Sequence, residues 1–195
     1  MKTLIIFTHP NHHSLSYSFL QTTIQGLRDN PNKQEIEVLD LYAESFDPLL
    51  VFNEHKRRRD MHLDPNLEKY RNQLLWAERI VLIYPIWWGR PPAMLLGYID
   101  QMFASNFAYR ENGGLLPEGL LKGRSVVCIS VMKGPTLYPL FWLNNAHKTL
   151  MRKALFRYVG IKEVKFFEFG GMEKPGGKQV KKLEQIYRYF KAIVQ

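Results

Sequence analysis

Residues 80–93, with the sequence IVLIYPIWWGRPPA, constrain the fold more than any other part of the chain. The apolar run 80–84 is typical of a strand that is buried on both faces, and Pro85 ends it. From residue 93 to residue 103, apolar side chains recur at helical spacing. The segment therefore predicts a strand, a rigid aromatic loop and a helix, in that order.

The rest of the chain repeats this alternation of strand and helix. We expect strands over residues 3–7, 36–41, 125–131 and 164–169, and helices over residues 15–27, 66–76, 140–158 and 179–194. Residues 42–65 are expected to be irregular, and the glycine-rich stretch 107–123 to form an excursion or a small hairpin. Five strands that alternate with helices are typical of a parallel α/β sheet covered on both faces, here as one domain over residues 1–195.

Two strand orders are common in such sheets, and one motif separates them. The dinucleotide-binding order requires G-x-G-x-x-G after the first strand, but no glycine lies between Met1 and Gly26. We therefore expect the flavodoxin-like order 2-1-3-4-5, a three-layer sandwich with helices on both faces. Its switch point lies between the first and third strands, so the loops after Phe7 and Tyr84 should face each other across one cleft.

The chain carries a formal net charge of +9 and a single cysteine. A basic chain can bind nucleic acid, an anionic membrane or a phosphorylated ligand, but this sequence has no zinc-finger spacing, ribonucleoprotein motif or helix-turn-helix. Its densest basic cluster, residues 56–59, lies between Glu54 and Asp60, which is typical of a solvated surface. With no secretory signal, no membrane-length apolar run and a lone Cys128 in a buried strand, we expect a cytoplasmic protein that does not bind nucleic acid.

The loop of residues 8–16 joins the first strand to a helix N-terminus. Such a terminus offers unpaired N–H groups and a partial positive charge to an anion. His9, Ser14 and Ser16 add side-chain donors, which makes the loop a candidate phosphate site; helix capping by Ser14 is the equally supported alternative. No metal site is expected, because adjacent histidines on an extended loop diverge and no carboxylate or thiolate accompanies them at ligand spacing.

Two adjacent tryptophans follow the third strand. Adjacent tryptophans are more often core or interface residues than ligand contacts, but this pair lies at the carboxyl end of a strand, where open sheets bind ligands. A third loop, residues 132–138, contains Gly134, which permits close approach of the backbone. A phosphate site at one end and an aromatic wall at the other suit a flavin, which would carry the redox chemistry while the protein positions and tunes it.

The sequence resembles the flavodoxin-like NAD(P)H:quinone oxidoreductase family, particularly its short bacterial members of the general-stress or modulator type. The resemblance covers nearly the whole chain. It rests on residues 9–10 with 14–16, on residues 84–88 with 92–103, and on residues 107–109 with 120–124. The block Pro-x-Trp-Trp followed by Pro-Ala-x-Leu-x-Gly and Asp is its most specific part.

The resemblance implies FMN or FAD as cofactor, a homodimer with active sites at the subunit interface, and ping-pong transfer of hydride from NADH or NADPH to a quinone or a similar small electrophile. The short chain favours FMN. The implied cofactor-binding residues are His9, Ser14, Leu15, Ser16, Pro85, Ile86, Trp87, Trp88, Lys133 and Gly134. The implied catalytic residues are Tyr138 and Trp88.

The chain departs from the family pattern at a few positions. Family members often carry Thr-Thr-Gly-Gly after the fourth strand, where residues 131–134 are Val-Met-Lys-Gly. Lys133 would instead place a positive charge near the pyrimidine end of the flavin, and Ser16 stands in place of the usual asparagine. His147 lies in a predicted helix and matches no family position. The alternative function is that of a flavin-binding regulatory subunit of a membrane potassium efflux system, docking through residues 56–59.

Overall fold

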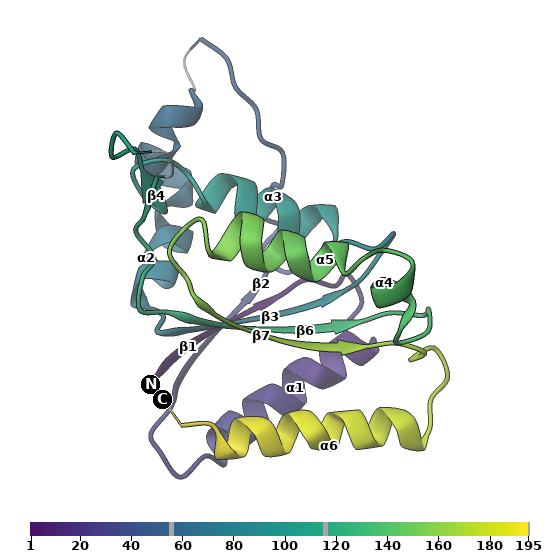
Figure 1. The fold of residues 1–195 in the computed structure, drawn as a ribbon. Coiled ribbons are helices and arrows are strands. Elements are labelled where there is room, and N and C mark those ends of the chain that lie inside the picture. Colours follow the sequence, from purple (N-terminus) through teal and green to yellow (C-terminus); the bar gives the residue numbers. More distant parts are fainter. Residues whose placement is uncertain (55–56, 115–116, 195) are drawn as a thin grey trace.

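Five parallel strands form one sheet at the centre of the molecule (Figure 1). The structure is a computed structural model and describes residues 1–54, 57–114 and 117–194. The strands are β1 (Lys2–Phe7), β2 (Glu35–Asp40), β3 (Arg79–Pro85), β6 (Ser125–Val131) and β7 (Glu163–Phe169), in the order β2-β1-β3-β6-β7. Since β4 (Tyr109–Arg110) and β5 (Glu118–Gly119) form a separate two-stranded sheet, this is the predicted order 2-1-3-4-5, and the expected hairpin is confirmed.

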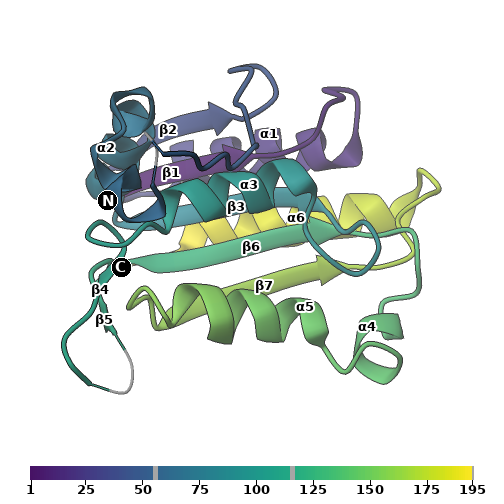
Figure 2. The same ribbon diagram turned by 90° about the horizontal axis from the view of Figure 1, so that it is seen from above.

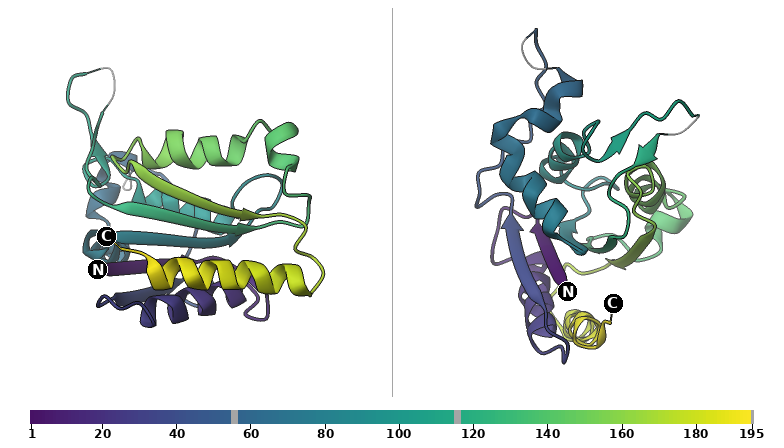
Figure 3. Two further views of the ribbon diagram at one scale, coloured as in Figure 1. Left: turned by 60° about the horizontal axis from the view of Figure 1, so that its bottom comes forward. Right: turned by 90° about the vertical axis from the view of Figure 1, so that its left-hand side faces the viewer.

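Helices cover both faces of the sheet and give three layers (Figures 1 and 2). One face is covered by α1 (Leu15–Arg28) and α6 (Gly177–Ala192). The other is covered by α2 (Glu68–Trp76), α3 (Ala93–Met102) and α5 (Ala146–Thr149). The hairpin β4–β5 extends away from the sheet (Figure 3, left). Each face packs its own apolar core, so the fold rests on two hydrophobic layers that share the strands between them.

Strand β3 is the central strand, and all seven of its residues are buried. Its neighbours end level with it, because Phe7 of β1 pairs with Ile83, and Pro85 pairs with Val131 of β6. Parallel strands place their carboxyl ends at one edge of the sheet. The loops after β1, β3 and β6 therefore leave the sheet side by side, as the sequence predicted.

The prediction of one helix over residues 140–158 is wrong. The structure has a short helix α4 (Tyr138–Phe141), a turn, the helix α5, and then a π-helical segment η3 (Leu150–Phe156). Asn144 and Asn145 lie between α4 and α5 with φ of 47° and 53°. Asparagine tolerates this left-handed conformation, which interrupts a right-handed helix. Residues 42–65, expected to be irregular, contain the 3₁₀ segment η1 (Arg58–Leu63), and η2 (Pro65–Leu67) leads into α2.

A buried polar chain ties α5 to the carboxyl edge of the sheet. Tyr84 of β3, Ser130 of β6 and Glu168 of β7 lie in one lateral row. His147 of α5 bridges this row, with Nε2 at 2.8 Å from the Tyr84 hydroxyl and Nδ1 at 2.9 Å from Glu168 Oε2. Because a carboxylate only accepts, the histidine donates from Nδ1. Tyr84 immediately precedes the aromatic loop, so this chain fixes the point at which the loop leaves the sheet.

The environment of this chain shifts the acid–base properties of its members. Burial alone would raise the pKa of the Glu168 carboxyl, but the hydrogen bond from His147 and the charge of Lys148, whose Nζ lies 3.4 Å away, leave that pKa below its ordinary value. Burial raises the pKa of Tyr84 well above its ordinary value. Burial also raises the pKa of the Cys128 thiol to about 12, so the lone cysteine is an inert core residue.

Replacing Glu168 with glutamine keeps the shape of the side chain but removes its charge. Since the carboxyl pKa is lowered by folding, its stabilisation is present above the ordinary value of 4.5 and is lost as the pH falls through the lowered value. We expect Glu168→Gln to reduce the free energy of unfolding by about 2 kcal/mol at neutral pH and to make its decline in acid shallower. Urea denaturation across a pH series measures both effects.

Glu163→Gln is the matched control, because Glu163 is exposed at the start of the same strand. It should change the free energy of unfolding by less than about 0.5 kcal/mol. If Glu168→Gln and the unmodified protein had equal stability and equal dependence on acid, the stabilising role of the Glu168 carboxylate would be contradicted.

Candidate functional site

A cavity of about 330 Å³ opens at the carboxyl edge of the sheet, where the predicted loops meet. It is lined by His9, Ser14, Leu15, Ser16, Pro85, Ile86, Trp87, Val131, Met132, Lys133, Met172 and Glu173. Eight of these are the predicted cofactor-binding residues other than Trp88 and Gly134. The structure thus brings the first and third strand loops together across one cleft, as the switch-point argument required.

The start of α1 forms the polar end of this cavity. Ser14 is the N-cap, and its Oγ accepts a hydrogen bond from the main-chain N–H of Tyr17 at 3.2 Å. The first N–H groups of a helix have no carbonyl partner within it, so those of Leu15 and Ser16 face outward. The side chain of Ser16 is buried, and its Oγ has no hydrogen-bond partner among the described residues. A buried hydroxyl without a partner at a helix N-terminus fits an anionic oxygen.

His9 supplies a further donor to the same end. Its Nδ1 accepts from the main-chain N–H of Asn11 at 3.0 Å, which in the neutral ring leaves the proton on Nε2. Burial lowers the pKa of His9, which favours this neutral form. The imidazole lies 6.1 Å from the ring of Trp87, measured between centroids. His9 therefore connects the polar end of the cavity to its aromatic side.

The two tryptophans separate at a tight turn. Trp87 and Arg90 exchange main-chain hydrogen bonds of 3.0 and 3.1 Å, and the two residues between them, Trp88 and Gly89, have φ of 53° and 73°. Positive φ at both central positions is the geometry of a type I′ turn, which is strained for a large residue such as tryptophan. Trp87 lines the cavity and is 42 % exposed, whereas Trp88 is 97 % exposed.

A second cavity, of about 400 Å³, adjoins the first. The two share Ile86, Met132 and Lys133. The remaining lining residues of the second are Trp88, Gly89, Gly134, Tyr138, Pro139 and Leu143. All the predicted site residues therefore line one or other of two adjoining cavities, and the predicted catalytic pair, Tyr138 and Trp88, lies in the second.

The loop after β7 contributes residues that the sequence reading missed. Glu173 lines the first cavity, and its Oε1 lies 2.7 Å from Nζ of Lys133. A carboxylate thus offsets the lysine charge expected near this site. The third loop rests on this segment, because the Gly171 N–H donates to the carbonyl of Gly134 at 2.7 Å. The sequence could have indicated these residues, since the loop after the fifth parallel strand must also leave from the carboxyl edge of the sheet.

The histidines of the first loop do not converge. Nε2 of His12 lies 2.6 Å from Asp40 Oδ2, and its ring stacks on Tyr17, so His12 ties the loop to β2 and α1. Across residues 1–54, 57–114 and 117–194, no group of three His, Cys, Asp or Glu side chains is placed to hold a metal ion. In the basic cluster of residues 56–59, Lys56 lies outside the described residues, and Arg59 pairs with Asp60 at 3.8 Å.

None of the helices in the described part of the chain is both long and apolar enough to cross a membrane.

The comparisons with known proteins agree with this geometry. The chain is 31 % identical over 172 residues to a Haemophilus influenzae protein named "Uncharacterized NAD(P)H oxidoreductase", covering 87 % of this chain and 84 % of that protein. It is 32 % identical over 133 residues to FMN-dependent NADH:quinone oxidoreductase 1 of Bacillus cereus, covering 62 % of each. The crystal structure of Smu.1420 from Streptococcus mutans superposes with a TM-score of 0.89 at 33 % identity, covering 98 % of this chain and 99 % of that one.

The family model described as "Flavodoxin-like fold" matches residues 1–193, nearly the whole chain. Together with the strand order and the relatives, this match shows that the chain belongs to the flavodoxin-like family.

Proposed function

We propose that this chain binds FMN in the first cavity and transfers hydride from NADH or NADPH to a quinone or a similar small electrophile. The observation that carries the proposal is that an anion site and an aromatic wall, on loops far apart in sequence, line one cavity that continues into a second. The names of relatives support it, since the Haemophilus protein is called an NAD(P)H oxidoreductase and the Bacillus protein an FMN-dependent NADH:quinone oxidoreductase.

The residues of the first cavity fit FMN. The unpartnered hydroxyl of Ser16, the N–H groups at the start of α1 and the His9 ring are donors suited to a phosphate. Trp87 and Ile86 offer apolar surface, and Gly134, which lines the adjoining second cavity, offers main-chain groups for the polar edge of a ring. When bound, FMN supplies the chemistry of accepting a hydride from a nicotinamide and passing it on.

The second cavity is the proposed site for the nicotinamide and then the acceptor, in turn. Tyr138 carries a hydroxyl that can donate a hydrogen bond to an acceptor oxygen, and its ring stacks on Trp142 at 6.3 Å between centroids. Trp88 offers an aromatic face at the rim. These residues orient the substrate and exclude water rather than form a covalent bond with it. Occupation of one cavity by two substrates in succession is the structural basis of a ping-pong reaction.

We further propose a homodimer with the site at the subunit interface. Large apolar side chains are exposed beside the second cavity: Trp88 (97 %), Leu137 (58 %), Leu140 (46 %), Phe141 (68 %) and Trp142 (75 %). An apolar patch of this kind marks an interaction surface.

The lone buried cysteine, which forms no disulfide, suits a reducing compartment such as the cytoplasm.

Sedimentation equilibrium at micromolar concentration should give twice the chain mass of 23.0 kDa. A species of 23.0 kDa at every concentration would contradict the dimer.

Ser16→Ala tests the phosphate site. Loss of one hydrogen bond to a charged group should weaken FMN binding about tenfold, as measured by fluorescence titration of the flavin-free protein. Because the hydroxyl has no protein partner among the described residues, the stability of the flavin-free protein should not fall. Ser18→Ala is the matched control, since Ser18 is exposed two residues further along α1 and lines neither cavity. Equal FMN affinity for Ser16→Ala and Ser18→Ala would contradict the assignment.

Trp88→Gly tests the second cavity, because glycine keeps the positive φ of the turn while the ring is removed. The unmodified protein should oxidise NADH when menadione is present, with parallel double-reciprocal plots. We expect the KM for menadione to be about tenfold higher in the variant, because about 1.4 kcal/mol of stacking with Trp88 is lost. The affinity for FMN should not change. Leu63→Ala, which removes an exposed apolar side chain outside both cavities, should leave both constants unchanged. An unchanged KM for Trp88→Gly would contradict the assignment.

A further inference from the structure

The opposite edge of the sheet holds a buried arginine with almost no partner. Arg79 is the first residue of β3, and only 2 % of it is exposed. Its one hydrogen bond to a described residue is long, 3.4 Å from Nη2 to the carbonyl oxygen of Val194. Nε and Nη1 are both buried and have no partner in the described part of the chain. Most N–H donors of this guanidinium are therefore buried without a hydrogen-bond acceptor among the described residues.

No carboxylate among the described residues forms an ion pair with this guanidinium, and the charge of the nearby Glu78 compensates it only in part. The neighbouring Glu78 is engaged elsewhere, since its Oε2 accepts from the main-chain N–H of Lys2 at 2.7 Å. Burial lowers the pKa of Arg79, as expected for a cation that lacks full compensation, but a guanidinium still keeps its proton at neutral pH. A buried charge without a partner is strongly destabilising. Such a group calls for an anion that the described residues do not supply.

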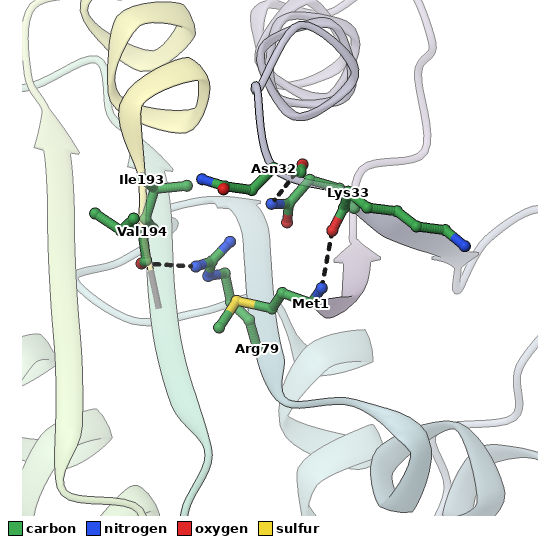
Figure 4. A pocket seen from close by; sticks show the side chains of 7 residues that line it. Met1, Asn32, Lys33, Arg79, Ile193 and Val194 are labelled. Atoms are coloured by element: carbon green, nitrogen blue, oxygen red, sulfur yellow. Dashed lines mark hydrogen bonds between the residues drawn. The ribbon is translucent and has the colours of Figure 1, made fainter.

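A cavity of about 330 Å³ lies against this guanidinium, between the loop 32–34 and the C-terminal segment 193–194 (Figure 4). It is lined by Met1, Asn32, Lys33, Gln34, Arg79, Ile193 and Val194, none of which is acidic. Another cavity at this edge, of about 280 Å³, is also lined by Arg79 and by residues 193 and 194, but its lining includes the acidic Glu163. The charges therefore favour an anion in the cavity beside residues 32–34, which has no acidic lining residue.

The same cavity also offers an acceptor. Oε1 of Gln34 is buried and has no partner among the described residues, while its Nε2 donates to the carbonyl of Asn32 at 3.2 Å. A ligand that satisfies both sides must carry oxyanion acceptors for Arg79 and a hydroxyl donor for Gln34. Hydrogen phosphate carries both, and a guanidinium fork matches its oxygens in pairs.

We infer that this cavity is a binding site for a phosphate with a hydroxyl, either free hydrogen phosphate or a small phosphate monoester that carries a hydroxyl of its own, held by Arg79. The site is separate from the proposed flavin site. Strand β3 runs from Arg79 to Pro85, so about 20 Å of strand lies between the two. Binding at one site therefore leaves the other open, and the inference does not depend on the proposed function.

The test is the thermal unfolding of the whole protein in matched ionic strength, with sodium phosphate, glycerol 3-phosphate, sodium acetate or sodium chloride. A ligand that binds only the folded state raises the unfolding temperature. We expect phosphate to raise it to a plateau above the chloride value, and acetate to have little effect. A response to glycerol 3-phosphate at lower concentration than to inorganic phosphate identifies a monoester as the ligand; the reverse identifies the free ion. Calorimetric titration gives the dissociation constants.

Arg79→Met keeps the length and apolar stem of the side chain and removes its charge. It should abolish the phosphate response, raising the dissociation constant at least tenfold, and in chloride it should be at least as stable as the unmodified protein. Arg79→Lys keeps the charge without the fork and should respond weakly. Lys153→Met is the control, because Lys153 is exposed and does not line this cavity, and it should keep the response.

Several results would overturn the inference. One is an unmodified protein that responds equally to phosphate and chloride, or equally to phosphate and acetate. Another is an Arg79→Met variant that keeps the phosphate response, which would place the anion elsewhere. A third is an Arg79→Met variant that is less stable than the unmodified protein in chloride, which would mean that the guanidinium is satisfied within the chain.

Discussion

The lateral pairing of β3 between β1 and β6 is the interaction on which the rest of the structure depends. It buries a continuous apolar strand on both faces, which only a parallel sheet with helices on each side can do. The pairing continues past the strand ends: the Thr8 N–H donates to the carbonyl of Ile83 at 2.9 Å, and the Ile86 N–H to that of Val131 at 2.8 Å. These two bonds fix the start of the loop after β1 to β3 and the start of the aromatic loop after β3 to β6.

The two edges of the sheet are chemically different. The carboxyl edge offers neutral donors, a helix N-terminus and aromatic surface, and its buried charge is paired through His147 and Glu168. Such an edge can receive a phosphorylated aromatic ligand. The amino edge instead buries Arg79 without an ion-pair partner among the described residues. The fold therefore places neutral donors and the paired charges of Lys133 and Glu173 at one edge of the sheet, and the buried guanidinium at the other.

The sequence predicted the features that depend on local pattern. The apolar runs located four of the five strands, the alternation of apolar and acidic residues over 36–41 located the other, and the missing glycines selected the strand order. The loops at the carboxyl ends then located the cleft residues from His9 to Gly134, which the structure brings together. The roles of those residues toward a flavin remain proposals that the experiments above address.

The features that were missed depend on contacts between distant residues. The bridge from Tyr84 through His147 to Glu168 joins residues 63 and 21 positions apart and leaves no local signal. The break before α5 depends on the left-handed conformation of Asn144 and Asn145, which a helical pattern does not show. Arg79 resembles an ordinary charged residue at the start of a strand, and its burial becomes visible only once Val194 lies against it.

The central claim is that the cleft beside β3 holds a flavin. The most direct measurement is the absorbance spectrum of the purified protein, followed by mass identification of the flavin released on denaturation. The account predicts a yellow protein, or a colourless one that becomes yellow with added FMN, that releases one FMN per chain. A protein that stays colourless and takes up neither FMN nor FAD would contradict it.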